Sequence, residues 1–277
     1  MRQAPSPDNL ARNEFQAIVN DHYRSHGREM PWRETSDPYH ILVSEIMLQQ
    51  TQVGRVIEKF KEFIAAFPDI PALDRASLQE VLSVWQGLGY NRRALALKTI
   101  AGQVMEEFGG LFPRSIPDLI RLKGIGRYTA GAIMAFTFNE PAVFIETNIR
   151  TVFIHHFFAR QEGVQDSQIL PLVEAMLDRE NPRVWYWALM DYGAMLKKNG
   201  LDMNGRSAHH QKQTPFHGSF RQLRGKILKA LVSTTGLTLT QIAQETGFPP
   251  DHVADGVQRL EAEGFIVSEG AHYRVSE

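Results

Sequence analysis

The chain has 277 residues, of which 43% are hydrophobic and 22% charged, and its formal net charge is −1 at pH 7. A chain of this length can bury a sizeable core and is expected to form two domains. The balanced charge excludes a protein that is basic throughout, so any contact with nucleic acid must come from a local basic face. Because we find neither a membrane-length apolar run nor a signal-peptide core, we expect a cytoplasmic location.

The chain contains no cysteine. This excludes disulfides and any zinc site or iron–sulfur cluster held by cysteine. Histidines occur as adjacent pairs, His155-His156 and His209-His210, but neighbours in a helix or strand point to different faces and no carboxylate is spaced to assist them. We therefore predict neither a metal ion nor another cofactor.

The first part of the chain reads as all-α, because strand signals are scarce before residue 237. Ser77 followed by Glu80 is a capping box, and Gly109-Gly110 is a typical helix end. The apolar periodicity predicts helices over residues 42–66, 77–85, 92–108 and 184–196.

Residues 197–218 interrupt the periodicity with glycine, serine and proline and carry several cations. They predict a basic linker between a first domain at 1–196 and a second at 219–277. In the second domain the expected order is a helix over 220–231, a strand over 237–239, helices over 240–246 and 251–263, and a hairpin over 265–275. This order is typical of a small α+β winged-helix domain.

The most informative segment is Ser44–Val53, which places one carboxylate, Glu45, in an apolar helical stretch that runs into Gln49 and Gln50. At helical spacing Glu45 would be at least partly desolvated, which favours the protonated form and suits a general acid. Taken alone, the pattern also fits an ordinary surface glutamate beside a core stripe, which is the commoner case.

Further motifs accompany this segment: Pro31-Trp32-Arg33, Trp85–Tyr90, Leu122–Gly131 and Glu146-Thr147-Asn148. In this order and spacing, residues 15–195 resemble the helix-hairpin-helix DNA glycosylases, specifically the MutY adenine glycosylase branch. The resemblance implies an all-α helix-hairpin-helix glycosylase domain ahead of the winged-helix domain. Many members hold an iron–sulfur cluster with four cysteines just after the segment matching Trp187–Met195, so this chain resembles a variant that lacks the cluster.

The segment Leu122–Gly126 resembles the hairpin of that motif. Its two glycines let the backbone turn tightly and aim N–H groups at a phosphate, to which the next helix adds its dipole. The residues that the resemblance assigns to DNA binding here are Lys123, Gly124, Gly126, Arg127 and Thr129.

Tyr128 occupies the place where relatives that also cut the DNA backbone carry a lysine that attacks C1′. A phenol cannot form a Schiff base, so Tyr128 favours a monofunctional enzyme that leaves an abasic site. Lys123 is close in sequence, and an imine formed by Lys123 stays open as an alternative.

A glycosylase extrudes its target base, and the vacancy must be filled. By the resemblance, Gln49 and Gln50 would fill it and Tyr90 would wedge beside the opposite base. The alternatives are a polar helix end for the glutamines and a core aromatic for Tyr90. The glycine-rich Gly87-Leu88-Gly89 before Tyr90 indicates an exposed loop and favours the wedge.

Cleavage of an N-glycosidic bond requires a proton for the leaving base and negative charge near C1′. Glu45 would protonate the purine N7. The second group, an aspartate in the family, is Glu146 here, whose extra methylene moves the carboxylate by about 1.5 Å. Asn148 matches the family's asparagine and would hold Glu146 or a water.

A basic stretch of the linker and the next helix is a candidate DNA-binding surface, with Arg221, Arg224 and Lys226 as its central residues; an ordinary solvated basic linker is the alternative. The other cations of this surface are Lys197, Lys198, Arg206 and Lys212 in the linker and Lys229 on the helix. By contrast, the helix over 251–263 is acidic and should repel a phosphate backbone.

These features predict a monofunctional base excision repair glycosylase, monomeric and nucleoid-associated, that removes a mispaired base, most simply adenine, from double-stranded DNA. Nothing matches the β-rich Nudix-like domain of familiar MutY enzymes, so a same-fold enzyme for thymine, uracil or another modified base stays open. A non-catalytic DNA-binding regulator is a further alternative, although it would need neither Glu45 nor an acid at position 146.

Overall fold

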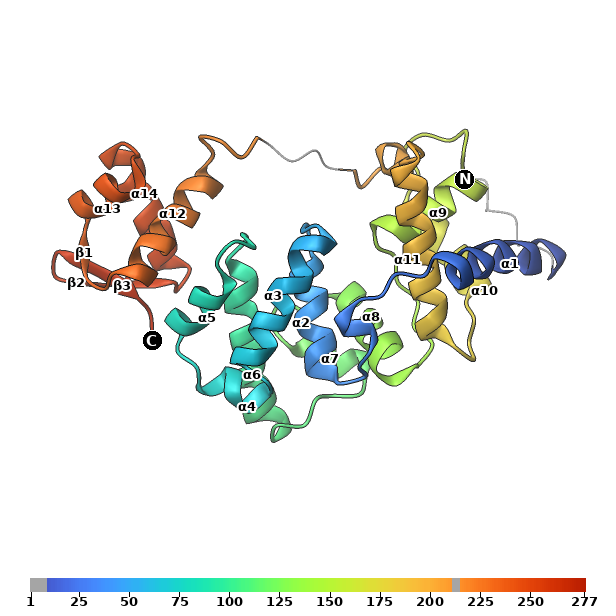
Figure 1. Ribbon diagram of the computed structural model, residues 1–277, viewed down its shortest axis with the longest axis horizontal. Helices are drawn as coiled ribbons and strands as arrows, with labels where there is room; N and C mark the ends of the chain where they lie inside the picture. Colours follow the sequence, from blue (N-terminus) through green and yellow to red (C-terminus); the bar gives the residue numbers. More distant parts are fainter. Residues whose placement is uncertain (1–8, 211–214) are drawn as a thin grey trace. The chain divides into compact units, whose positions relative to one another are not determined.

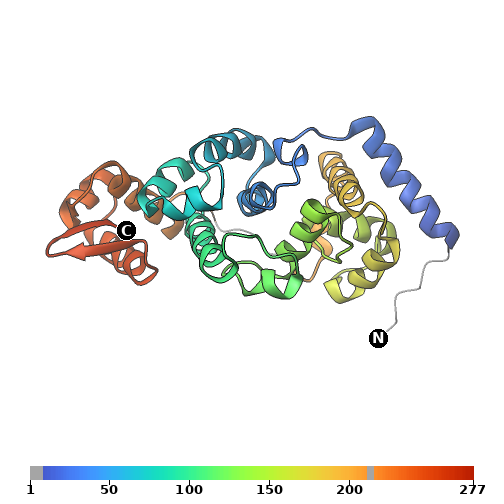
Figure 2. The ribbon, with the colours of Figure 1, turned by 90° about the horizontal axis from the view of Figure 1, so that it is seen from below.

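A computed structural model describes residues 9–210 and 215–277, shown in two views in Figures 1 and 2. The described residues form two compact units whose segments alternate along the chain. Within the described ranges, the first unit draws on 9–42, Arg114–Arg121 and 125–210, and the second on Val43–Pro113, Leu122–Gly124 and 215–277. The expected boundary at residue 196 lies within the first unit, and the division into domains at 1–196 and 219–277 stays a prediction.

The first unit is helical. Its elements are α1 (Asn9–His26), η1 (Pro31–Arg33), the start of α2 (Pro38–Leu48), α7 (Ile116–Arg121), α8 (Arg127–Phe138), α9 (Thr147–Phe157), α10 (Asp166–Met176), α11 (Pro182–Lys198) and η2 (Met203–Arg206). Helix α11 packs against both α9 and α1. Phe153, Trp185 and Tyr186 are almost fully buried between these helices, and the predicted helix over 184–196 is confirmed within α11.

The first part of the expected linker is folded in this unit. Asn204 in η2 donates a hydrogen bond to the Thr151 hydroxyl of α9 over 3.0 Å, and Val164 and Ser207 form an isolated parallel bridge. Arg206 also donates to the backbone oxygen of Ala159. The expected basic residue Lys212 lies outside the described residues.

The second unit begins with the rest of α2 and continues through α3 (Val53–Ala66), α4 (Ile70–Arg75), α5 (Leu78–Trp85) and α6 (Arg92–Phe108). The single helix expected over 42–66 is wrong: α2 ends at Leu48, α3 begins at Val53, and Gln50 between them has a φ of 55°. An α-helix cannot pass through a residue in the left-handed region. The helices predicted over 77–85 and 92–108 are confirmed, with the Ser77 capping box and the Gly109 cap.

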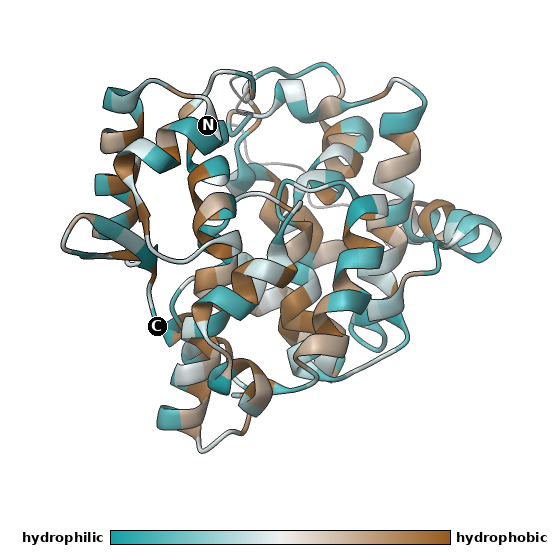
Figure 3. Ribbon diagram, turned by 60° about the vertical axis from the view of Figure 1, so that its left-hand side comes forward, coloured by the Kyte–Doolittle hydropathy of each residue, from teal (hydrophilic) through white to brown (hydrophobic). Residues whose placement is uncertain are grey.

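The C-terminal part of this unit has the predicted order of elements. They are α12 (Phe220–Ser233), β1 (Leu237–Thr238), α13 (Leu239–Thr246), α14 (Pro250–Ala262), β2 (Ile266–Glu269) and β3 (His272–Val275). The strands form an antiparallel sheet of order β1-β3-β2, with Glu269 opposite His272 at the hairpin turn. Figure 3 shows apolar and polar residues on the same helices throughout, as expected of helices with one buried face.

Across residues 9–210 and 215–277, we find no helix that combines the length and the apolar character needed to cross a membrane.

Candidate active site

Glu45 is buried near the end of α2, with a relative exposure of 5%. Ile41, Leu42 and Ile46 on the same helix are at most 2% exposed. The desolvation expected from the sequence is therefore confirmed. Exclusion of water from the carboxyl group is what the role of a proton donor to a leaving base requires.

Two loops of the second unit carry the residues expected to fill a gap in DNA. The loop after α2 holds Gln49, which is half-buried, and Gln50, which is exposed. The loop before α6 holds Tyr90, which is 37% exposed and has a φ of 49°. Gln50 and Tyr90 are both non-glycine residues in the left-handed region, a conformation that costs energy and recurs at functional sites. Thus the Tyr90 ring is accessible, and the core-aromatic alternative does not describe it.

Arg93 joins these two loops, and sequence reasoning missed it. Its guanidinium group donates to the backbone oxygens of Ile46 and Met47 over 3.0 and 2.9 Å, and it also donates to the backbone oxygen of Gln49. On the other side it donates to the backbone oxygen of Gly89 over 3.2 Å. Burial lowers the pKa of Arg93 to about 10, which leaves the side chain charged at neutral pH. One buried cation therefore fixes the glutamine loop to the Tyr90 loop.

The hairpin glycine of the second unit has the predicted backbone conformation. Gly124 has a φ of 97°, and a Cβ atom there would lie 3.3 Å from the Cβ of Ala96. The side chain of Lys123 is exposed, and its backbone N–H donates to Gln103 over 2.7 Å. Only glycine adopts this φ without strain, so the tight turn depends on Gly124.

Helix α8 of the first unit begins directly after the hairpin. Its N-cap is Gly126, which supplies no side-chain acceptor, and Arg127 beside it is exposed. Backbone N–H groups in a first turn without a side-chain cap can bind an anion such as a phosphate. Thr129 is only 3% exposed, so any contribution of this residue to DNA binding falls to its backbone rather than its hydroxyl.

Tyr128 is half-buried on the same helix. Its ring packs edge-on against Phe144, with centroids 5.6 Å apart. A Cβ atom on Gly131, one turn further, would lie 3.0 Å from the Phe144 ring, so the glycine permits this close packing. The phenol is therefore fixed in orientation by the core of the first unit.

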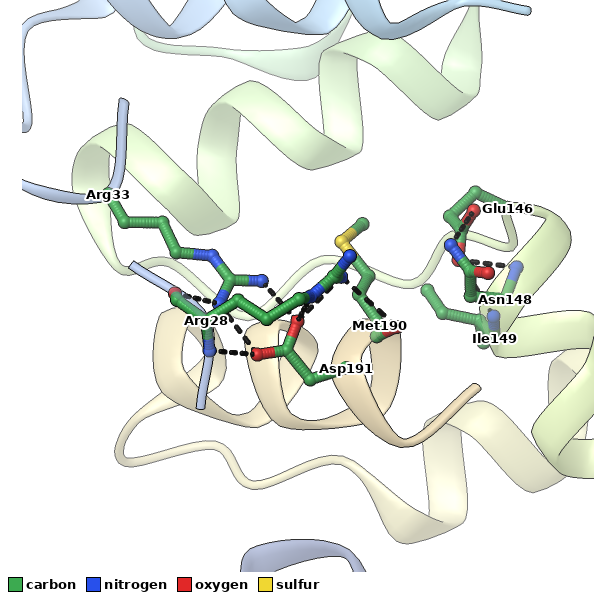
Figure 4. Close-up of polar contacts among 7 residues, drawn as sticks. All are labelled: Arg28, Arg33, Glu146, Asn148, Ile149, Met190 and Asp191. Atoms are coloured by element: carbon green, nitrogen blue, oxygen red, sulfur yellow. Dashed lines mark hydrogen bonds and ion pairs between the residues drawn. The ribbon is translucent and has the colours of Figure 1, made fainter. Parts of the chain in front are cut away.

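Glu146 is the N-cap of α9 (Figure 4). One carboxylate oxygen accepts hydrogen bonds from the backbone N–H groups of Asn148 and Ile149, over 2.6 and 2.8 Å. The other accepts from the Asn148 amide over 3.2 Å and from the Thr147 hydroxyl over 3.1 Å. The expected pairing of Glu146 with Asn148 is thus present. The carboxylate is held at the positive end of a helix dipole, in a fixed position.

Helix α11 supports this end of α9. A Cβ atom on Gly193 would lie 2.5 Å from the backbone oxygen of Asn148, so only glycine lets the two helices approach this closely. Two residues earlier on α11, Asp191 accepts hydrogen bonds from Arg28 and Arg33 (Figure 4). Burial alone would raise the pKa of Asp191, but the hydrogen bonds from Arg33 and Arg28 outweigh it and lower the pKa. Pro31-Trp32-Arg33 therefore has a structural role here.

Lys197, near the end of α11, adds a positive charge close to Glu146. Burial lowers the pKa of Lys197, while the negative charges of Glu146 and Asp202 oppose the shift. This lysine was expected in the basic linker, and the structure places it within a helix instead.

The three cations expected as a DNA-binding surface on α12 all have partners within the second unit. Arg221 donates to the Tyr90 hydroxyl over 2.7 Å. Arg224 is ion-paired with Glu263. Lys226 donates to the backbone oxygen of Thr246 over 2.6 Å. A DNA phosphate would have to compete with these partners.

His156 of α9 packs against the rings of Phe15 and Tyr192. The His156 ring nitrogen lies 3.1 Å from the Tyr192 hydroxyl, and burial, together with the charge of His155, lowers the pKa of His156 to about 4. Within the described ranges, no group of three or more His, Asp or Glu side chains is arranged to hold a metal ion.

The chain is similar to known proteins in sequence and in structure. The model of the HhH-GPD superfamily base excision DNA repair proteins matches residues 43–170. The adenine DNA glycosylase of Mycolicibacterium smegmatis is 33% identical over 80% of this chain and 81% of its own length. That of Buchnera aphidicola subsp. Baizongia pistaciae is 35% identical over 66% of this chain and 52% of its own length.

Among solved structures, a thermostable thymine-DNA glycosylase superposes with a TM-score of 0.62 at 27% identity, over 68% of this chain and 88% of that one. The chain spans about half the length of several curated relatives that it matches. These similarities define a class of DNA repair protein. The chain belongs to the HhH-GPD superfamily of base excision DNA repair proteins.

Proposed function

We propose that this protein is a monofunctional DNA glycosylase that flips a mispaired base, most simply adenine, out of double-stranded DNA and leaves an abasic site. One observation carries the proposal: the buried carboxyl of Glu45 lies on the helix that ends at Leu48, directly before Gln49 and Gln50. Arg93 ties that helix end to the loop of Tyr90. Arg93 thus keeps the helix of the proposed proton donor and the residues proposed to fill the emptied base stack in fixed positions relative to one another.

The proposed reaction divides the work between two carboxyl groups. Glu45 donates a proton to N7 of the leaving purine, which weakens the bond from C1′ to the base. Glu146 supplies negative charge to the oxocarbenium-like state, and its four donors keep the carboxylate in place. Water then adds to C1′, so the sugar–phosphate backbone stays intact.

Tyr128 supports the monofunctional assignment because a phenol forms no imine. Lys123 has an exposed side chain and is the residue to suspect if an imine does form. The hairpin at Gly124 and the first turn of α8 after Gly126 are proposed to bind the phosphate backbone through their N–H groups. We further propose that the protein acts as a monomer on chromosomal DNA, which would place it at the nucleoid.

A second candidate is removal of thymine from a mispair. It is favoured by the similarity to the thermostable thymine-DNA glycosylase, which extends over 68% of this chain. In that case Glu45 would have a different task, because a thymine has no N7 to protonate.

The test is a panel of duplexes with each mismatch and common lesion, incubated with enzyme and then with alkali. We expect the adenine strand of a mispair to break only after alkali. Breakage of the thymine strand instead would select the second candidate. If no duplex shows a new break, the remaining alternative is a non-catalytic DNA-binding protein.

A further inference from the structure

The C-terminal part of the second unit contacts the proposed wedge directly. Arg221 on α12 donates a hydrogen bond to the Tyr90 hydroxyl over 2.7 Å, and its guanidinium carbon lies 5.7 Å from the centroid of the Tyr90 ring. The Arg93 guanidinium carbon lies 5.3 Å from the same centroid. Two cations from different parts of the chain therefore hold one exposed aromatic side chain.

An ion-pair cluster beside the wedge fixes this contact. Glu263, just after α14, accepts hydrogen bonds from Arg92 over 2.9 and 2.6 Å, and it also pairs with Arg224. These hydrogen bonds lower the pKa of Glu263 to about 2. Arg92 is two residues after Tyr90, so the cluster holds α12 and the wedge loop at the same point. Gln79 adds a hydrogen bond to the backbone oxygen of Val232 over 3.3 Å.

Tyr90 needs such support because its backbone is in the left-handed region, with a φ of 49°. A bulky residue persists there only when its surroundings hold it. Arg93 fixes the backbone of the Tyr90 loop by donating to the Gly89 oxygen, and Arg221 holds the hydroxyl end of the Tyr90 side chain.

We propose that Arg221 is a positioning residue for the Tyr90 wedge, through which the C-terminal part of the chain controls how Tyr90 enters the duplex. The inference rests on the proposed function, since a wedge has a purpose only in an enzyme that opens a base pair. It differs from the expectation that Arg221, Arg224 and Lys226 bind phosphates, because each of these cations already has a protein partner.

The test is a double-mutant cycle in the full chain with Arg221→Gln, Tyr90→Phe and the double variant. Tyr90→Phe keeps the ring and removes the acceptor of the Arg221 hydrogen bond. The duplex carries an abasic-site analogue opposite 2-aminopurine, whose fluorescence rises when an inserted side chain disturbs its stacking. Lys61→Gln is the control, because Lys61 is an exposed cation of the same unit that lies on α3, outside the expected DNA-binding surface.

We expect each single variant to weaken the fluorescence response and binding by about threefold to tenfold, the range for one hydrogen bond. The double variant should be no worse than either single variant, and the salt dependence of binding should match that of the wild type. Lys61→Gln should behave as wild type. Thermal unfolding of each variant checks that the fold is retained.

Two results would overturn the inference while leaving the proposed function intact. If the two effects multiply and Arg221→Gln lowers the salt slope by about one, Arg221 is a phosphate ligand. If Arg221→Gln changes nothing, the contact has no role in DNA binding. A wild-type protein that does not bind the abasic duplex at all would instead contradict the proposed function, and this inference with it.

Discussion

The two candidate catalytic carboxyl groups, Glu45 in the second unit and Glu146 in the first, have different local surroundings. Glu45 is 5% exposed on a helix where Ile41, Leu42 and Ile46 are also buried. Glu146 is half-buried, and its carboxylate accepts four hydrogen bonds at the start of α9. These local surroundings are consistent with the different tasks proposed for the two residues. An apolar environment suits a group that must carry and release a proton, and a ring of donors suits one that must keep its charge in a fixed position.

The comparison also explains how a glutamate can occupy the family's aspartate position. The longer side chain folds back to cap its own helix, and α11 approaches closely enough at Gly193 to hold that helix end.

The largest effect is expected for Glu45→Gln. The amide keeps the shape of the side chain but cannot protonate a leaving purine at neutral pH, so base removal should fall by at least about a thousandfold. Binding to an abasic duplex should change by less than about tenfold. Single-turnover cleavage assays and binding titrations measure the two quantities, and a variant with full excision activity would exclude Glu45 as the acid.

Next in size is Glu146→Gln, which removes the charge but keeps an acceptor for the helix. We expect a loss of at least about a hundredfold in rate, or about 2.7 kcal/mol of barrier. The change in unfolding free energy should stay within about 1 kcal/mol, as for the loss of one helix cap. A glutamine variant as fast as the parent would leave Glu146 with the capping role alone.

Glu146→Asp is the matched control for that variant, because aspartate also caps helices well. It should remain as stable as the wild type and yet be slower, since its carboxylate is withdrawn from C1′. A faster enzyme would instead mean that the site is a degraded form of the aspartate design.

A smaller effect is expected for Gly193→Ala, which leaves both carboxyl groups chemically unchanged. The added Cβ would lie 2.5 Å from the Asn148 backbone oxygen, so the start of α9 must move. Overpacking of this kind costs about 1–3 kcal/mol, and the displaced Glu146 should lower the rate at least about tenfold. Gly54→Ala on α3, where a Cβ meets open space, is the control in both denaturant unfolding and kinetics. If the two variants have the same stability and the same rate, the close approach of α11 to α9 does not position Glu146.

The smallest effect concerns His156 on α9, and it appears only in acid. Burial lowers its folded-state pKa to about 4, below the ordinary value of 6.5. The unfolded chain therefore takes up the proton first, so stability is complete above about pH 6.5 and falls as the pH drops towards 4, by no more than about 3 kcal/mol. His156→Gln should flatten this part of the stability profile in denaturant titrations at several pH values. If the stability of the variant falls with pH in parallel with that of the wild type, other groups cause the acid sensitivity.

The local features of the fold could be predicted from sequence because neighbouring residues determine them. The capping box of Ser77 with Glu80 and the left-handed cap at Gly109 are of this kind. The burial of Glu45 also followed from helical periodicity alone. The capping role of Glu146 was missed, although an acceptor just before a helix start is a readable signal.

The contacts that organise the site could not be predicted in this way. Arg93 donates to backbone oxygens 46 and 47 residues away, and backbone acceptors leave no mark in the sequence. The break between α2 and α3 at Gln50 is stabilised by the same long-range bonds. The apolar periodicity of the sequence continues across the break and therefore predicted a single helix. The partners of Arg221 and Arg224 depend equally on tertiary structure, which is why these residues were expected to face phosphates.

The most direct test of the account identifies the base that is released. The preferred duplex from the mismatch panel is incubated with wild type, Glu45→Gln or Glu146→Gln under single-turnover conditions, and the free base is identified by mass spectrometry before any alkali is added. We predict free adenine and an intact strand with one abasic site from the wild type, a slow release from Glu146→Gln, and none above background from Glu45→Gln. Adenine released by Glu45→Gln at the wild-type rate, or a strand already broken before alkali, would contradict the separate roles proposed for the two carboxyl groups.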